Sequence, residues 1–250
     1  MRTLDGRPFF VHRVSMQAIQ SADQAKVAVI YSGHARTARH TLANQFWMVL
    51  RRYPNRHVFA HLANDADGQW FLENADRYLR CNVTVKLADQ PAQFDEYSPE
   101  THAHAPYDNS VSNEAIQGQL WHMEQALAMV HRPELFHTFI RMRPDVFFHE
   151  YDKPAQPAHN EAHTPFWGRF GGCNDRFAVM GQTAATAYLS TFSRIDQHLA
   201  DGCPLHPESL VRHSLESAGC VVTNAAYAVF STVRANGEIR FPEIQHHETK

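Results

Sequence analysis

The sequence predicts an α/β protein: a three-layer α/β/α sandwich in which helices cover both faces of a mostly parallel central sheet. Short apolar runs of strand length alternate along the chain with longer segments of helical periodicity. A parallel strand needs a crossover connection, usually a helix, so this alternation indicates β-α-β units. The 250 residues can bury a full core, and no internal repeat divides them. We expect one domain over residues 1–250, with a polar leader (1–24) and a polar tail (234–250) at its periphery.

The first strand is predicted at Lys26–Tyr31, and it runs into the loop Ser32–Thr37. Apolar residues then recur at helical spacing from Leu42 to Leu50, so a helix follows the loop. A strand, a glycine turn and a helix in this order present backbone N–H groups to an anion. Gly33 permits close approach of a ligand, and Arg36 can add a bidentate phosphate contact. A plain tight turn would look similar, because the loop matches neither a Walker sequence nor G-x-G-x-x-G.

The next elements are a strand, a short helix and a strand, at Arg56–Leu62, around Trp70–Leu79 and at Asn82–Leu87. Asp65 and Asp67 form a D-x-D pair after the first of these strands, where a metal could bind. Because Asp and Gly are common turn residues, we interpret the pair as part of a turn. The polar segment Ala88–Asn113 is long for a loop inside a compact domain, so we interpret it as a candidate substrate lid.

The second half continues with a helix at Glu114–Val130, a strand from Phe136, a connection at Tyr151–Pro165, a strand at Phe177–Met180, helices at Thr183–Leu199 and Pro207–Ser217, and a late strand at Cys220–Val222. Two acids lie beside these elements. Asp175 comes just before the strand at Phe177–Met180, and Glu208 lies in the first turn of its helix. There Glu208 could simply complement the helix dipole.

The stretch Phe136–Phe148 is the predicted functional centre. Arg141 and Arg143 are two apart, so they project from the same face of an extended chain. Pro144 cannot donate a ladder hydrogen bond, so the strand should end or reach an edge there. Asp145 would then emerge at the carboxyl end of a central strand, where open α/β sheets bind ligands. An Arg–Asp ion pair closing the strand is the structural alternative, but three charges at this position favour a polyanionic ligand and a cation.

Composition and charge limit the other possibilities. The chain is 44% hydrophobic and 20% charged, with a formal charge of −3, so no polybasic field favours nucleic acid as a partner. The cysteines are widely spaced and lack a C-x-x-C pair, which argues against a zinc knuckle or disulfide scaffold. No apolar run reaches the roughly 20 residues that span a bilayer, and residues 1–24 lack a signal-peptide core. We expect a cytoplasmic protein without a transmembrane segment, peripheral to a membrane at most.

The 18 histidines raise the possibility of a metal site. Close pairs occur at His102 and His104, His159 and His163, and His246 and His247. None of these pairs has a third ligand at a recognisable spacing, and a dedicated site needs three or four converging ligands. We therefore expect no histidine metal site and most histidines in contact with solvent.

Four stretches in this order resemble the GT-A class of nucleotide-sugar glycosyltransferases, and look closest to a small group related to bacterial lipopolysaccharide and capsule synthesis: Ser32–Thr37, Ile140–Val146, Asn174–Gly181 and Pro207–Leu210. The resemblance covers the chain from Val27 to about Val222 and implies a GT-A-like (Rossmann-like) domain. One departure concerns the metal. The usual D-x-D motif is replaced at the matching place by Arg143-Pro144-Asp145, which keeps only the last acid.

The resemblance implies transfer of a sugar from a nucleotide-sugar donor to a glycan, a lipid-linked or another hydroxyl acceptor, in surface polysaccharide or glycan synthesis. It assigns nucleotide and donor binding to Ser32, Gly33, His34, Arg36, Arg141 and Arg143. Asp145 would anchor Mn²⁺ or Mg²⁺ on the diphosphate, although arginines can also stabilise that charge. An inverting enzyme needs a carboxylate base, for which we favour Glu208, with Asp175 in contact with the donor sugar or acceptor.

Two alternatives remain open at this stage. A non-catalytic protein of the same fold could bind a sugar nucleotide or glycan, which the incomplete D-x-D favours. Another nucleotide-handling α/β enzyme, such as a nucleotidyltransferase, would need a glycine- and lysine-rich first loop, which this sequence lacks. Neither the donor sugar, the nucleobase nor the stereochemical outcome follows from the sequence, and fold alone does not fix function.

Overall fold

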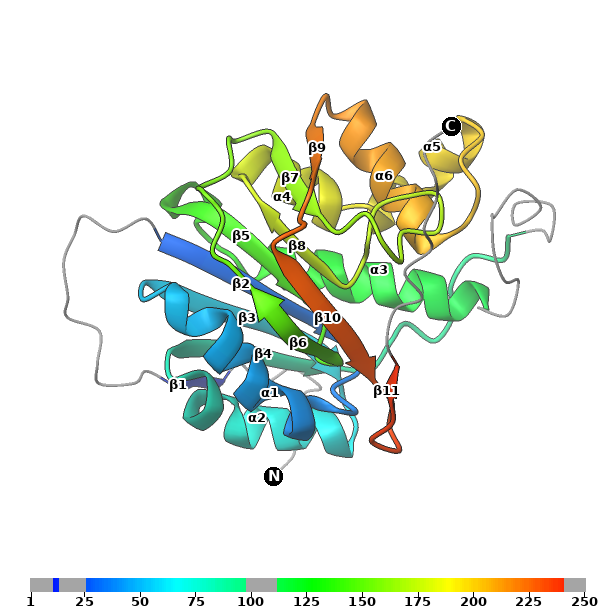
Figure 1. Ribbon diagram of the computed structural model, residues 1–250. Helices are drawn as coiled ribbons and strands as arrows, with labels where there is room; N and C mark the ends of the chain where they lie inside the picture. Colours follow the sequence, from blue (N-terminus) through cyan, green and yellow to red (C-terminus); the bar gives the residue numbers. More distant parts are fainter. Residues whose placement is uncertain (1–10, 14–25, 98–111, 241–250) are drawn as a thin grey trace.

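The computed structural model describes residues 11–13, 26–97 and 112–240 (Figure 1). Its main sheet has eight strands in the order β1-β4-β3-β2-β5-β8-β7-β9. Their bounds are β1 (Val11–Arg13), β2 (Lys26–Gly33), β3 (Arg56–Ala63), β4 (Asn82–Ala88), β5 (Phe136–Met142), β7 (Glu161–Thr164), β8 (Phe177–Met180) and β9 (Val221–Asn224). The predicted leader residues 1–10 and 14–25, residues 98–111 of the predicted lid, and tail residues 241–250 lie outside the described ranges.

The centre of this sheet is parallel. Strands β4, β3, β2 and β5 are neighbours and all run in one direction, whereas β1 and β8 add antiparallel partners at either side. Beyond β8 follow β7, antiparallel to it, and β9, parallel to β7. The chain builds outward from β2 to β4 and then returns to place β5 on the other side of β2. The order of the strands therefore reverses between β2 and β5, which is where ligands bind in open α/β sheets.

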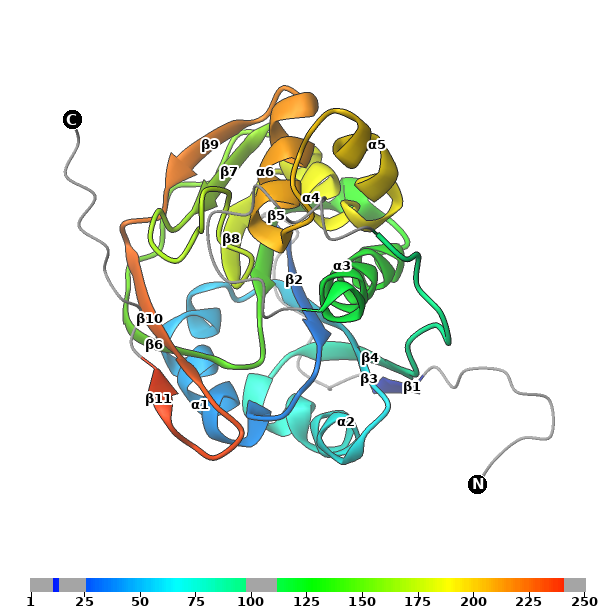
Figure 2. The same ribbon diagram turned by 90° about the vertical axis from the view of Figure 1, so that its right-hand side faces the viewer.

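Helices cover both faces of the sheet, which confirms the predicted α/β fold (Figures 1 and 2). One face carries α1 (Ala38–Met48) and α2 (Ala66–Leu79), and the other carries α3 (Asn113–Ala128), α4 (Gln182–Leu189) and α6 (Pro207–Ser217). No helix in the described ranges is long and apolar enough to cross a bilayer.

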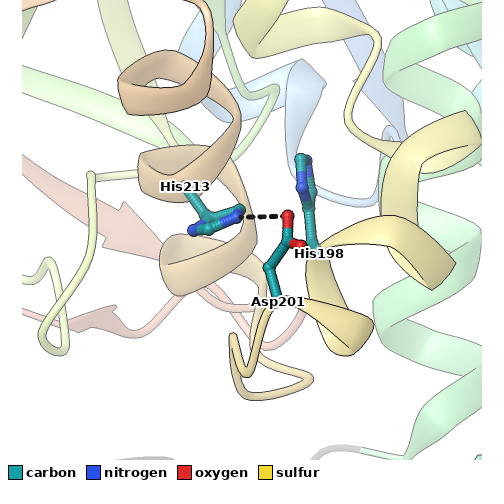
Figure 3. Close-up of side chains that lie close together, drawn as sticks. All are labelled: His198, Asp201 and His213. Carbon is teal, nitrogen blue, oxygen red and sulfur yellow. Dashed lines mark hydrogen bonds and ion pairs between the residues drawn. The ribbon is translucent and has the colours of Figure 1, made fainter.

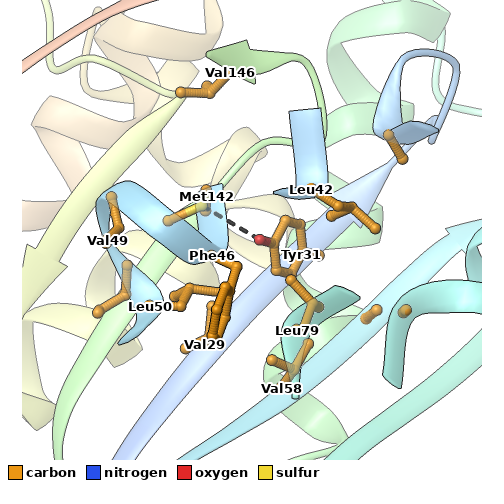
Figure 4. Close-up of a cluster of buried hydrophobic side chains, with 14 of the residues drawn as sticks. Val29, Tyr31, Leu42, Phe46, Val49, Leu50, Val58, Leu79, Met142 and Val146 are labelled. Carbon is orange, nitrogen blue, oxygen red and sulfur yellow. Dashed lines mark hydrogen bonds between the residues drawn. The ribbon is translucent and has the colours of Figure 1, made fainter. Parts of the chain in front are cut away.

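The central strand β2 explains how two cores form. Its Val27, Val29 and Tyr31 side chains pack on the face covered by α1 and α2, and Ala28 and Ile30 pack against the face covered by α3. The alternation follows from the two-residue period of a strand, and a strand buried on both faces must be apolar throughout. Figure 4 shows the first of these cores, in which the Tyr31 hydroxyl reaches the Met142 sulfur at 3.3 Å.

A second, smaller sheet was not predicted. It consists of β6 (Val146–Tyr151), β10 (Ala228–Val233) and β11 (Ile239–Arg240) in the order β11-β10-β6. The prediction that the central strand ends at Pro144 is correct, because β5 stops at Met142. The apolar residues after Pro144 belong to this other sheet, however, which packs against α1.

Three further predictions about elements need correction. The single helix expected at Thr183–Leu199 is divided into α4 and α5 (Ile195–Ala200), with the 3-10 helix Phe192–Arg194 between them. The connection at Tyr151–Pro165 contains strand β7. The D-x-D pair was interpreted as part of a turn, but it forms the start of helix α2: Asp65 caps the helix by accepting from Gly68 N at 2.8 Å, and Asp67, in its first turn, pairs with Arg39.

Candidate functional site: an arginine-lined cavity between β2 and β5

A cavity of about 470 Å³ lies at the carboxyl ends of β2 and β5, where the strand order reverses. We call it the β2–β5 cavity. The loop after β2, the start of α3, the turn after β5 and the chain after β10 border it. All the residues predicted for donor and metal binding line it: Ser32, Gly33, His34, Arg36, Arg141, Arg143 and Asp145. It also has lining residues that the sequence analysis did not single out, including Thr37, Gln119, His122 and Arg234.

The loop after β2 gives the cavity two buried hydroxyl groups. Gly33 has a φ of +92°, a conformation that favours glycine, and it turns the chain from β2 toward α1. Ser32 and Thr37, on either side of this turn, are buried at 4% and 2% exposure. Neither hydroxyl has a hydrogen-bond partner within the described part of the protein. A buried hydroxyl without a partner is costly, so a ligand that accepts hydrogen bonds fits this loop.

Replacing Gly33 with alanine tests the loop. An added Cβ meets nothing within 4 Å, so the change costs backbone strain alone, about 1–2 kcal/mol. We expect ligand affinity to fall about tenfold as the loop relaxes and carries the Ser32 hydroxyl away. Gly219→Ala is the matched control, because Gly219 also has a positive φ, +66°, and open space, but lies after α6. Isothermal calorimetry with a nucleoside diphosphate measures both, and equal affinities in the two variants would contradict the role of the loop.

Arg141 is a buried cation whose hydrogen-bond partners in the described ranges are backbone carbonyl groups. Its side chain projects from β5 and is 0% exposed. The Nη1 atom donates to the carbonyl oxygens of Ile30, at 3.4 Å, and Met142, at 3.2 Å. Its Nε and Nη2 atoms have no partner among the described residues. Burial, together with the nearby Arg143 charge, lowers the pKa of Arg141 to about 10, so it remains charged at neutral pH.

Arg143 and Asp145 form an ion pair, which the sequence analysis gave as the structural alternative to ligand binding. Arg143 Nε lies 3.0 Å from Asp145 Oδ1, and its Nη2 lies 2.6 Å from Oδ2. A third guanidinium nitrogen, Nη1, contacts Asp175 Oδ2 at 3.2 Å. Burial disfavours the charge of Arg143, but the carboxylates of Asp145 and Asp175 raise its pKa above the ordinary value. Both partners of the pair nevertheless line the cavity, so the pair does not remove them from a ligand.

The donor set fits an anion better than a resident divalent cation. Mg²⁺ and Mn²⁺ bind oxygen ligands, chiefly carboxylates. Both oxygens of Asp145 already accept from one guanidinium group. The described residues that line the cavity include four arginines, Arg36, Arg141, Arg143 and Arg234, against two acids, Glu114 and Asp145. Such a cluster would repel a metal ion and attract a phosphate.

The turn that carries Arg143 and Asp145 is held from two sides. From α1, Gln45 Nε2 donates to the carbonyl oxygens of Arg143, at 3.1 Å, and Val146, at 2.7 Å. From β10, the Val233 N–H donates to the Asp145 carbonyl oxygen at 2.8 Å. Helix α1 and strand β10 thus hold the backbone of the turn that carries the ion pair.

The predicted catalytic acids lie behind the cavity wall. Asp175, just before β8, is 2% exposed and accepts from Gln119 at 2.5 Å and from Arg143. Arg176 then links Asp175, at 3.6 Å, to Glu208, at 3.7 Å, in the first turn of α6. Gln119 and Arg143 line the cavity and contact Asp175, whereas Glu208 is connected to Asp175 through Arg176. The structure therefore brings both acids together but does not place either at the cavity surface.

A family model described as "Domain of unknown function (DUF7796)" matches residues 22–245. The chain belongs to this family. No curated protein matches the sequence. Among solved structures, the apo form of mouse xyloside xylosyltransferase 1 is similar with a TM-score of 0.42 and 12% identity, over 80% of this chain and 84% of that one. The glycosyltransferase GlyE of Streptococcus pneumoniae TIGR4 has a TM-score of 0.39 and 9% identity, over 82% of this chain and 46% of that one.

The surroundings of the two buried acids in this DUF7796 chain shift their pKa values in opposite directions. Burial would raise the pKa of Asp175, but the guanidinium groups of Arg176 and Arg143 lower it to about 2. Burial raises the pKa of Glu208 to about 8, and the neighbouring Asp175 charge adds to this effect. At neutral pH Asp175 is ionised and Glu208 is mostly protonated. Two titratable groups with pKa values pushed apart are typical of acid–base chemistry.

The raised pKa of Glu208 predicts a pH effect on stability. Between pH 4.5 and about 8 the folded state binds the Glu208 proton more tightly than the unfolded state. Stability therefore falls as pH rises through this interval. Glu208→Gln cannot ionise, so we expect its stability advantage over the wild type to grow with pH there. Urea denaturation of both proteins measures this, and parallel stability curves across the interval would show that Glu208 has an ordinary pKa in the fold.

A buried histidine pair in this DUF7796 chain was missed by the sequence analysis. His61 of β3 and His122 of α3 share a hydrogen bond between their Nδ1 atoms at 2.9 Å, and His122 lines the cavity. Burial lowers their pKa values, to about 3 and about 4, so both are neutral at physiological pH. Their Nε2 atoms have no partner in the described ranges. Gln119 and His122 are three apart on a predicted helix, a spacing that could have indicated a shared face.

Proposed function

We propose that this protein is a glycosyltransferase that binds the diphosphate of a nucleotide-sugar donor in the β2–β5 cavity. One observation carries the proposal: residues lining the cavity hold buried polar atoms without partners in the described structure, namely Ser32 Oγ, Thr37 Oγ1, Arg141 Nε and Nη2, and His122 Nε2. Hydroxyl and guanidinium groups can all donate hydrogen bonds. A ligand rich in acceptor oxygens satisfies them together.

The size and charge of the cavity support a nucleotide diphosphate. Its volume of about 470 Å³ is within the range of small-molecule sites. Guanidinium groups match phosphate oxygens in a bidentate arrangement, so Arg36 and Arg141 suit the two phosphate groups. The four stretches that resemble GT-A enzymes favour a sugar nucleotide over a free nucleotide. A glycan or lipid-linked acceptor, reached from the cytoplasm, completes the proposal.

The residues of the chain would act mainly through electrostatics. As the bond between sugar and diphosphate breaks, negative charge develops on the diphosphate, and Arg141 and Arg143 would stabilise it from fixed positions. We propose that these arginines replace the divalent cation expected from the GT-A resemblance, because Asp145 is engaged by Arg143. Asp145 then serves to orient that guanidinium group.

The base for the acceptor hydroxyl is assigned to the Asp175–Glu208 pair. Glu208 must lose its proton to act, so activity should rise with pH toward the raised pKa, about 8. Asp175 is charged throughout and would keep Arg143 and Arg176 in place. Since neither acid reaches the cavity surface, donor or acceptor binding has to move Gln119 or Arg176 for the acceptor to contact them.

That position of the acids favours a second candidate, a sugar-nucleotide-binding protein without transferase activity. Both acids are held by arginines behind the wall. The two functions share a donor site and differ in chemistry. Slow hydrolysis of the donor, the usual side reaction of a transferase, would distinguish them.

A thermal-shift screen of nucleoside diphosphates and their sugars tests the proposal. A ligand that binds the folded state raises the melting temperature by mass action. We expect one nucleotide to stabilise the protein selectively, both with Mn²⁺ and with EDTA. If the thermal shift is lost in EDTA, nucleotide binding requires a divalent cation, and Asp145 would be its ligand as the GT-A resemblance implies. If no nucleotide shifts the melting temperature in either buffer, the diphosphate site is wrong.

A further inference from the structure

Two histidines and an aspartate converge beside the middle of α6, outside the β2–β5 cavity. His198 comes from α5, Asp201 from the turn that ends α5, and His213 from α6. One ligand atom from each lies within 4.8 Å of the others (Figure 3). None of the three lines the β2–β5 cavity, and no other group of this kind occurs among the described residues.

The distances between these three side chains are close to those between the ligands of a metal site. His213 Nε2 lies 3.3 Å from Asp201 Oδ2, and the rings of His198 and His213 are 4.8 Å apart and nearly perpendicular. The other oxygen of Asp201 accepts from Gln197 Nε2 at 2.9 Å. Such a bond fixes the orientation of a carboxylate ligand.

The environment of His198 is a second, independent indication of a bound ligand. Its side chain is 2% exposed, yet neither ring nitrogen has a hydrogen-bond partner in the described part of the chain. A buried imidazole normally satisfies at least one nitrogen. Asp201 and His213 are more open, at 43% and 27% exposure, so an ion can reach the group from solvent.

We propose that His198, Asp201 and His213 bind a transition-metal ion of the zinc class, with one position left to water. Imidazole nitrogen and carboxylate oxygen suit such ions. At bond lengths of about 2.0–2.2 Å, tetrahedral ligand atoms lie roughly 3.3 Å apart. The His213–Asp201 distance, 3.3 Å, has this value, and His198 has to approach by about 1.5 Å at most.

The ion would tie α5 to α6. His213 lies five residues after Glu208 on the same helix, and the loop between α5 and α6 carries His206, which contacts Glu208 at 3.3 Å. A metal bound by His213 would therefore hold the helix that presents Glu208. The role is structural, and it is independent of the proposed donor site. The inference departs from the expectation that the chain has no histidine metal site, because these ligands converge only in the fold.

Zinc titration of the full-length protein tests the inference. After removal of metal with a chelator, Zn²⁺ is added in competition with a chromophoric chelator, and Co²⁺ is added separately to record its visible absorption. We expect the wild type to bind one equivalent more than His198→Gln or His213→Gln, with at least tenfold weaker binding in Asp201→Asn. His131→Gln, which changes an exposed histidine elsewhere, is the control and should match the wild type.

Stoichiometry separates this group from the histidine pairs outside the described residues, since those pairs are intact in every variant. His213→Gln keeps the inference testable if His198→Gln fails to fold, because His213 is the less buried ligand. Equal zinc binding and equal Co²⁺ spectra in wild type and His213→Gln would overturn the site. Nucleotide-induced thermal shifts should be unchanged in His213→Gln, so failure here and failure of the proposed function are distinguishable.

Discussion

Replacing Arg141 with methionine is expected to abolish binding of a nucleoside diphosphate while making the ligand-free protein more stable. Arg141 is fully buried, and two of its nitrogen atoms have no partner in the described structure. Methionine fills similar space without a charge. Removing an unpaired buried charge and its unsatisfied donors should recover about 1–3 kcal/mol. The gain is the free energy that the fold gives up to keep this cation at a binding site.

The loss of binding should be large. Each hydrogen bond to a charged group contributes about 1.5–3 kcal/mol, so two lost bonds correspond to more than about 100-fold in affinity. Calorimetry with the nucleotide identified by the thermal screen measures the affinity, and urea denaturation measures the stability. The two measurements should change in opposite directions.

Arg143→Met is the matched comparison. Arg143 has two carboxylate partners, Asp145 at 2.6 Å and Asp175 at 3.2 Å. Removing it takes away the cation paired with Asp145 and leaves Asp175 with Arg176, so this variant should lose stability where Arg141→Met gains it. If both variants are destabilised alike and the Arg141 variant still binds nucleotide, Arg141 is only a structural residue.

The parts of the site that sequence reasoning predicted share one property. Ser32–Arg36 and Arg141–Asp145 follow strands that are apolar enough to be recognised as central and parallel. In a parallel sheet the carboxyl ends of neighbouring strands meet at one edge, so order along the chain was enough to bring these stretches together. The ion pair of Arg143 and Asp145 was among the alternatives for the same reason, because residues two apart on a strand lie on one face.

The rest depended on tertiary contacts that no local pattern contains. Strand β6 pairs with β10, about eighty residues later, and only this pairing reveals that Phe147 and Phe148 belong to a second sheet. The break between α4 and α5 lies within a continuous helical pattern. His198 and His213 are separated by a loop, so their convergence could not be recognised from spacing. Asp175 and Glu208 are held behind the cavity wall by Gln119 and Arg176, neither of which was assigned a role from the sequence.

Asp175→Asn should produce the largest loss of stability of any single change at the site. Asp175 lies at the centre of the charged group, in contact with Arg143, Arg176 and Gln119. Removing one partner of a buried ion pair costs about 3–5 kcal/mol, because the remaining charges stay buried. Asp152→Asn, at an exposed aspartate, is the control and should change stability by less than about 0.5 kcal/mol. Urea denaturation near neutral pH measures both.

The same change should make Glu208 easier to ionise. The pKa of Glu208 is raised first by burial and then by the charge of Asp175, so a neutral residue at position 175 removes the second cause and lowers that pKa. Glu208 would then ionise at a lower pH than in the wild type and pair with Arg176, 3.7 Å away. In a double-variant cycle, Asp175→Asn should therefore cost less stability in the wild-type background, where Glu208 can ionise, than in the Glu208→Gln background, where it cannot. The charge of Asp175 contributes to the raised pKa of Glu208, so we expect this difference. Equal costs in the two backgrounds would show that the two carboxyl groups do not interact.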